Sequence, residues 1–141
     1  MRYLLDTMVL SEARKARADA RVIAWLERTP EDDVNISVLT LGEIERGIVR
    51  LGDAAARDRL RAWVENDLRP RFGERLLDVD AAVASTWGRI SGDAARTGRT
   101  VPVIDGLLVA TALRHGLTLV TRNGVHTEGL GVDVVDPWQA S

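Results

Sequence analysis

The sequence predicts an α/β domain in which helices flank a central parallel β-sheet. Short apolar runs alternate with segments whose apolar residues recur at helical spacing. Such alternation is typical of a parallel sheet with helices on both faces. A chain of 141 residues is long enough for one such domain and too short to divide comfortably into two, so we treat residues 1–141 as a single domain.

Each expected element in the first half of the chain has a local reason. Continuous apolar runs indicate strands, and apolar residues three or four positions apart, such as Leu41, Ile44, Ile48 and Leu51, indicate helices. Polar turns separate these segments. The expected elements, in order, are a strand at 2–5, helices at 9–17 and 19–28, a strand at 34–38, and helices at 41–51 and 54–68 that form a hairpin.

The second half follows the same rules. Pro70 and Gly73 break the helical pattern, and Gly116 stands at the usual C-cap position after a very apolar helix. The expected elements are a strand at 76–79, helices at 80–95 and 105–115, and strands at 117–121 and 132–135.

The composition limits the possible functions. Apolar residues make up 45% and charged residues 28% of the chain, which is ordinary for a globular protein. The absence of cysteine excludes disulfides, thiolate metal sites and a cysteine nucleophile. A net charge of -2 gives no global attraction for nucleic acid, so an RNA-binding surface would have to be local. Without a long apolar segment or a cleavage site, we expect a cytoplasmic protein with no membrane contact.

Three acidic residues follow apolar, strand-like runs: Asp6, Glu43 and Asp105. Ligands of open α/β sheets bind outside the carboxyl ends of the strands, so these side chains are expected to converge there. Their mutual repulsion would be costly unless a hard divalent cation such as Mg²⁺ neutralised it. The pattern therefore indicates a metal-dependent hydrolase of phosphodiesters.

Each of these acids also has a structural explanation. Asp6 can cap the first helix, Glu43 fits a capping box that starts at Thr40, and Asp105 can complement a helix dipole. Capping alone does not require three acids at one sheet edge, but it remains possible for each.

Four motifs, in order, closely resemble those of the PIN-domain ribonucleases, and the nearest branch is the VapC and FitB toxins of bacterial toxin-antitoxin pairs. They are Leu4-Leu5-Asp6-Thr7, the segment 37–47, the segment 102–112 that contains Asp105, and Leu119-Val120-Thr121-Arg122-Asn123. The resemblance implies that Asp6 and Asp105 are the main ligands of Mg²⁺, for which Mn²⁺ can substitute. It implies that Glu43 completes the catalytic cluster.

The chain departs from the family pattern at two positions. The fourth acidic position falls at Asn123 or His126, and neither is acidic. Met8 stands where this branch commonly has a polar residue. Thr7 and Asn123 are therefore taken as supporting residues. Candidate substrate-binding residues are Arg46, Arg50, Arg122 and His126, although a solvated helix face explains Arg46 and Arg50 equally well and an exposed loop explains His126.

The resemblance implies a magnesium-dependent endoribonuclease that acts as the toxin of a VapBC-type pair and cleaves cellular RNA to inhibit translation and growth. Expected partners are a VapB- or FitA-like antitoxin, RNA and a second copy of the chain, with operator DNA bound only through the antitoxin. The alternative is a catalytically weak or silent PIN-like module that acts through antitoxin and nucleic-acid complexes. A third possibility is a small phosphatase or exonuclease.

Overall fold

A parallel β-sheet forms the centre of the computed structural model, which describes residues 1–122 and 124–139. Within these residues five strands pair in the order β3-β2-β1-β4-β5, all of them parallel. The strand nearest the N-terminus, β1, is therefore the middle strand. The predicted fold class is confirmed. The strands are β1 (Tyr3–Leu5), β2 (Val34–Ser37), β3 (Leu76–Leu77), β4 (Thr118–Val120) and β5 (Val134–Val135).

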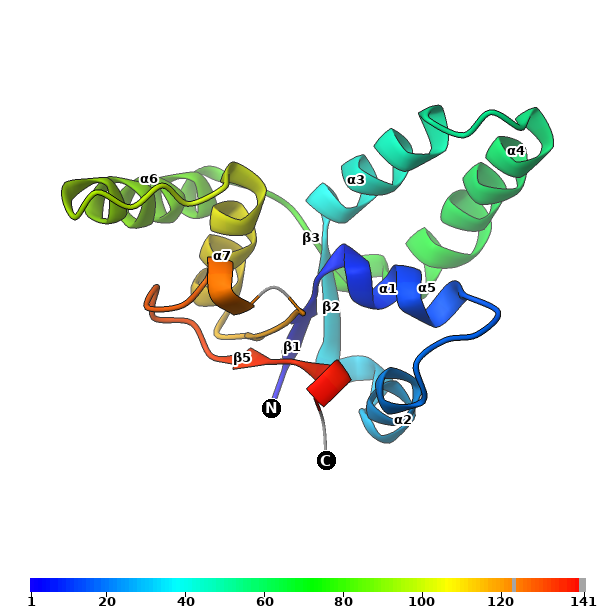
Figure 1. Cartoon of the computed structure of the whole chain (residues 1–141), viewed down its shortest axis with the longest axis horizontal. Helices are drawn as coiled ribbons and strands as arrows, with labels where there is room; N and C mark the ends of the chain where they lie inside the picture. Colours follow the sequence, from blue (N-terminus) through cyan, green and yellow to red (C-terminus); the bar gives the residue numbers. More distant parts are fainter. Residues whose placement is uncertain (123, 140–141) are drawn as a thin grey trace.

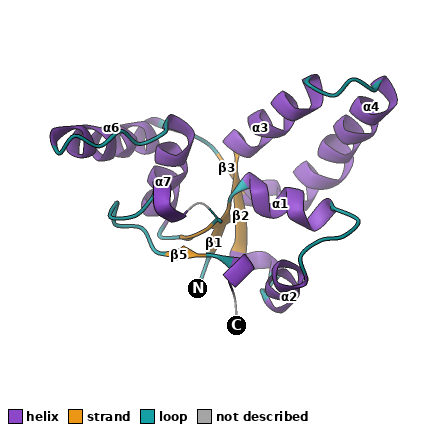
Figure 2. Ribbon diagram, in the orientation of Figure 1, coloured by secondary structure: helices purple, strands orange, loops and turns teal. Residues whose placement is uncertain are grey.

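Helices cover both faces of this sheet, as Figures 1 and 2 show. On one side lie α6 and α7, and on the other lie α1 to α5, with α3 and α4 packed side by side as a hairpin. None of the described helices is long and apolar enough to cross a bilayer. The helices are α1 (Thr7–Arg14), α2 (Ala20–Arg28), α3 (Val38–Val49), α4 (Ala54–Trp63), α5 (Arg69–Phe72), α6 (Ala81–Arg96) and α7 (Val103–His115).

The core has two parts, one on each face of the sheet. Successive side chains of a strand point to opposite faces, so Leu4 joins the cluster formed with α7 while Leu5 joins the cluster formed with α1, α2 and α5. Trp25 and Trp138 are buried in the second cluster, and Trp63 packs against it. Three of the four tryptophans of the chain therefore belong to, or border, this core.

The helix starts differ most from the prediction. Helix α3 begins at Val38, three residues earlier than expected, because the Ser37 hydroxyl accepts a 3.0 Å hydrogen bond from the Leu39 amide and caps the helix. Helix α7 begins at Val103, so the apolar run 101–104 is not a strand. Val103 and Ile104 are 58% and 38% exposed. These two β-branched residues are therefore not buried as they would be in a strand of the central sheet.

Other boundaries agree with the prediction more closely. The expected helix at 54–68 is helical throughout, but Val64–Leu68 forms a π-helix. The prediction that Pro70 breaks the helix is wrong, because α5 continues from Arg69 to Phe72, where proline occupies an early position that needs no amide donor, and only Gly73 ends it. Gly116 caps α7 with φ +66°, as expected for a glycine at that position. The strands are shorter than predicted, since apolar residues continue beyond the paired positions.

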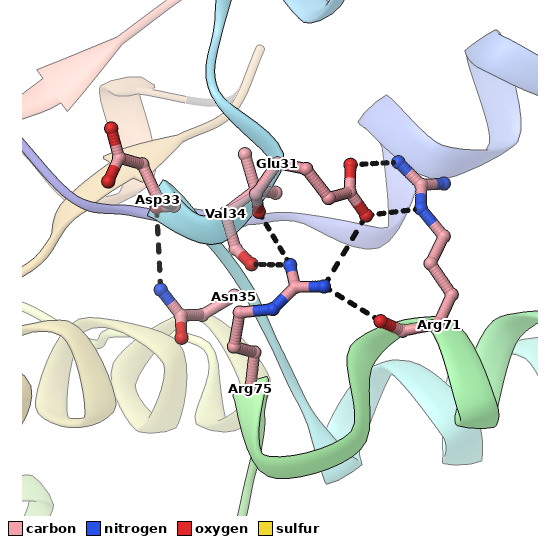
Figure 3. A network of polar contacts seen from close by, with 6 residues as sticks. All are labelled: Glu31, Asp33, Val34, Asn35, Arg71 and Arg75. Atoms are coloured by element: carbon pink, nitrogen blue, oxygen red, sulfur yellow. Dashed lines mark hydrogen bonds and ion pairs between the residues drawn. The ribbon is translucent and has the colours of Figure 1, made fainter.

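An arginine-centred network, which we call the Arg75 cluster, joins the segment before β2 to the segment before β3 (Figure 3). Arg75 donates hydrogen bonds to the carbonyl oxygens of Glu31 (2.7 Å), Val34 (2.6 Å) and Arg71 (2.7 Å). Arg71 binds the Glu31 carboxylate through two nitrogens, at 2.6 and 2.9 Å. Because these residues are about 40 positions apart in the chain, the cluster fastens one edge of the sheet.

Candidate functional site

Asp6 stands at the end of the middle strand, where the sequence predicted it. Its backbone amide donates to the Val120 carbonyl at 2.9 Å, and its Oδ2 accepts a 2.7 Å hydrogen bond from the Thr121 hydroxyl. The side chain is buried, with 8% of the residue exposed. Although Asp6 occupies the N-cap position of α1, its carboxylate makes no capping hydrogen bond. Helix capping therefore does not account for this side chain.

Glu43 lies on α3 rather than directly after a strand. Its Oε1 accepts a 2.7 Å hydrogen bond from the Thr7 hydroxyl, and Thr7 Oγ1 lies 3.1 Å from Thr40 Oγ1. The capping-box interpretation of Glu43 is wrong, since Ser37 is the N-cap and Thr40 is already inside the helix. The Thr7 hydroxyl instead connects the start of α1 to Glu43.

Asp105 lies in the first turn of α7, so a favourable interaction with the helix dipole is consistent with the structure. Its Oδ2 lies 3.5 Å from His126 Nδ1. Burial raises the pKa of the Asp105 carboxyl above its ordinary value of 3.8, the nearby His126 lowers that pKa, and the negative charge of Asp6 raises it further. Asp6 and Asp105 are thus close enough to repel each other.

The donor atoms of this site suit a hard divalent cation. Asp6 and Asp105 offer carboxylate oxygens, which Mg²⁺ prefers, and Mg²⁺ often uses only one or two carboxylates while it keeps several waters. Within residues 1–122 and 124–139, no three His, Asp or Glu side chains group closely enough to hold a metal among themselves. The fit is therefore that of a two-carboxylate site completed by water and substrate.

Glu43 separates two surface hollows. One is a groove of about 310 Å³ between α1, α3 and α4, bordered by Thr7 and Glu43 and lined by apolar residues together with Arg14 and Trp63. The other, of about 400 Å³, also includes Glu43, together with Arg46 and Ile104. A molecule bound in either hollow would contact Glu43, whereas neither Asp6 nor Asp105 is among the residues that line them.

The remaining candidates take different positions. Arg46 lines the second hollow beside Glu43, whereas Arg50 is the exposed C-cap residue of α3. The Arg122 guanidinium lies 5.0 Å from the ring centroid of Trp138. Asn123 lies outside the described residues, and Met8 is partly exposed at the start of α1.

The sequence analysis gave no role to Thr121. Its hydroxyl holds Asp6 although 115 residues separate the two. The sequence signal for this contact is a threonine that follows a buried strand, β4, which pairs with the strand before Asp6. Threonines at strand ends are too common for that signal to be specific.

Relatives from several bacteria match nearly the whole chain. Toxin FitB of Neisseria gonorrhoeae is 33% identical over 135 residues, which cover 96% of this chain and 97% of the relative. The VapC ribonuclease Y4jK of Sinorhizobium fredii is 28% identical over 136 residues, which cover 96% of this chain and 97% of the relative.

Solved structures agree with these matches. A crystal structure of FitAcB from Neisseria gonorrhoeae superimposes with a TM-score of 0.92 at 33% identity and covers 98% of this chain and 99% of that one. A crystal structure of DNA-bound VapBC from Salmonella typhimurium gives a TM-score of 0.77 at 27% identity and covers 97% and 98% of the two chains. The sequence also matches the PIN domain over residues 3–128. This chain belongs to the PIN-domain family.

Proposed function

We propose that this chain is a divalent-metal-dependent endoribonuclease and the toxin of a VapBC-type toxin-antitoxin pair. Cleavage of cellular RNA would inhibit translation and growth. The observation that carries the proposal is the pair Asp6 and Asp105, whose proximity helps to raise the pKa of Asp105. The similarity to a VapC ribonuclease and to toxin FitB over almost the whole chain supports the reaction and the cellular role. PIN-domain nucleases in general depend on a divalent metal.

Each side chain has a distinct part in the proposed mechanism. Asp105 and Asp6 hold the cation, directly or through water, and the Thr121 hydroxyl orients Asp6. Thr7 orients Glu43, which positions the attacking water. When bound, Mg²⁺, or Mn²⁺ in its place, supplies water activation and charge stabilisation at the scissile phosphate. Arg46, Arg50, Arg122 and His126 are the candidate contacts to RNA phosphates.

The proposed antitoxin covers the acidic edge of the sheet. The groove bordered by Thr7 and Glu43 offers an apolar surface that ends at a carboxylate, which suits a peptide with apolar side chains and an arginine. The solved FitAcB and DNA-bound VapBC structures support such a partner. We expect operator DNA to be bound through the antitoxin and not by this chain alone.

A homodimer is proposed through the face that carries Val103 and Ile104. Both side chains are exposed at the N-terminal end of α7, and Ile104 borders the second hollow beside Val38, Leu39 and Val79. Light scattering of the purified chain tests this arrangement, and Ile104→Glu is expected to shift the mass from dimer to monomer. A wild-type monomer at micromolar concentration would contradict it.

The test of the activity uses internally labelled circular RNA, which only an endonuclease can open. We expect cleavage in the presence of Mg²⁺ and none after Asp6→Asn, which keeps an oxygen acceptor for Thr121 but removes the charge. Asp80→Asn is the matched control, because Asp80 caps α6 and accepts from the Val83 amide at 2.9 Å away from the acidic residues.

Other outcomes select the alternatives. Hydrolysis from the ends of linear RNA with intact circles would indicate an exonuclease. A folded protein that cuts no RNA with Mg²⁺ or Mn²⁺ but still binds its antitoxin would indicate the silent module, which the lack of a three-residue metal cluster among the described residues favours. Equal activity of Asp6→Asn and wild type would refute the assignment of the site.

A further inference from the structure

His126 faces the acidic site from a short helical turn, Gly124–His126. Its Nδ1 lies 3.5 Å from Asp105 Oδ2, a separation longer than a good hydrogen bond. Two ligands of one cation, each with a bond of about 2.1 Å, lie roughly 3.0–3.5 Å apart at octahedral or tetrahedral angles. The two donor atoms are therefore spaced as ligands of one ion are.

Arg99 holds the segment that carries His126. From the connection between α6 and α7, its guanidinium donates to the His126 carbonyl at 3.2 Å and to the Glu128 carbonyl. The Thr127 hydroxyl and amide both bind the Gly124 carbonyl, at 3.0 and 3.1 Å. These contacts fix the backbone on both sides of the imidazole, so its position beside Asp105 is supported by the fold.

Both side chains are accessible to a hydrated ion. The side chain of His126 is 46% exposed and that of Asp105 is 25% exposed. A cation can therefore reach the two donors without opening the core.

We propose that His126 is a nitrogen ligand of the cation held by Asp105, so that this chain has a mixed oxygen and nitrogen metal site. The inference rests on the proposed function, whose metal it concerns. Asp105 and His126 would both contact the ion, and the charge of Asp6 would favour its binding. Imidazole suits Fe, Ni, Cu and Zn better than Mg²⁺, so the site favours first-row transition metals more than carboxylates alone would.

The test measures histidine nitrogen at bound Mn²⁺ by pulsed electron paramagnetic resonance. We expect a ¹⁴N coupling in wild-type protein that changes to a ¹⁵N coupling when only histidine is isotopically labelled. His126→Ala should abolish it. The chain has two histidines, and His115→Ala, at the far end of α7, is the matched control that should preserve it.

A second measurement compares affinities by calorimetry. His126→Ala is expected to weaken Co²⁺ binding about tenfold and Mg²⁺ binding about threefold or less, and His126→Asp is expected to restore Mg²⁺ more than Co²⁺. Arg99→Met should weaken Co²⁺ binding less than His126→Ala does, because it removes the contacts that hold the segment but keeps the imidazole.

The outcomes separate this inference from the proposed function. Bound Mn²⁺ without any histidine coupling, together with Mg²⁺-dependent RNA cleavage, overturns the role of His126 and leaves the ribonuclease intact. A coupling that persists in His126→Ala and disappears in His115→Ala also overturns it. If wild-type protein binds neither Mn²⁺ nor Co²⁺ and cuts no RNA, both proposals fail.

Discussion

The Arg75 cluster and the acidic site both join distant parts of the chain with charged groups, but the carboxylate charge is stabilised in the first and destabilised in the second. In the Arg75 cluster, Arg71 holds the pKa of Glu31 below its ordinary value through a hydrogen-bonded ion pair. In the acidic site, burial and the charge of Asp6 raise the pKa of Asp105. The first arrangement stabilises the fold, whereas the second retains an unfavourable charge that a cation can neutralise.

Asp105→Asn is expected to give the largest effect and to move activity and stability in opposite directions. RNA cleavage should fall at least about 100-fold, because a proposed ligand of the metal is lost. At pH 7 the melting temperature should rise by about 1–3 °C. The pKa of Asp105 is higher in the folded protein than in the unfolded chain. Its charged form therefore destabilises the fold at pH values above the folded pKa, and this destabilisation disappears at pH values below the unfolded pKa.

Calorimetric melting at several pH values checks the sign. The gain in melting temperature should shrink as the pH falls through the raised pKa of Asp105 toward its ordinary value of 3.8. A melting temperature that drops at neutral pH would show that Asp105 is a stabilising group, and the contrast between the two regions would be lost.

Arg75→Met tests the other region. The change removes the Arg75 donor from three carbonyl oxygens, of which that of Glu31 keeps the Val34 amide, so the free energy of unfolding should fall by about 2–3 kcal/mol in urea titrations. Arg69→Met is the matched control, because Arg69 makes only an exposed 3.4 Å ion pair with Glu65. Cleavage per folded Arg75→Met molecule should equal that of wild type. A specific loss of activity would show that the two regions are coupled.

Thr121→Val is isosteric and removes the hydroxyl that holds Asp6. We expect the affinity for Mg²⁺ to fall about tenfold, because groups that orient a metal ligand commonly contribute that much. Thr118→Val, at the start of strand β4 that ends just before Thr121, is the control and should leave the affinity unchanged. An affinity equal to wild type in Thr121→Val would mean that β1 alone places Asp6.

Glu31→Gln should have the smallest effect. The ion pair with Arg71 is half exposed, so its loss should cost about 0.5–1 kcal/mol at neutral pH. Because the pKa of Glu31 is lowered in the folded protein, its contribution is present above the unfolded pKa and lost as the pH falls through the folded pKa. Chemical denaturation of both proteins at pH 7 and pH 3 should therefore converge at the lower pH.

The sequence predicted the order of strands and helices well, because apolar spacing reports burial directly. The starts of α3 and α7 were predicted less well, because the apolar residues before Glu43 and Asp105 resembled strand ends but belong to helices. Only Asp6 directly follows a strand. The sheet-edge argument placed all three acids after strands, which holds only for Asp6, and no three acidic or histidine side chains among the described residues group closely enough to hold one metal.

The contacts that orient the site could not be predicted. Thr121 and Asp6 meet because β4 pairs with β1, and nothing in the local sequence of either strand specifies the other. The same is true of Arg99, whose partners lie 27 and 29 residues further along. Tertiary contacts of this kind depend on topology, which local periodicity does not contain.

The central position of β1 has a consequence for synthesis on the ribosome. The first strand emerges early but is paired on both sides only when β4, more than a hundred residues later, has also emerged. Until then Asp6 lacks Thr121, and α7, which carries Asp105, packs on β1 and α6 but lacks its contacts with β4. A nascent chain that stops short of β4 therefore lacks an assembled form of the proposed metal site. The cell is exposed to the proposed nuclease only when most of the chain has been translated.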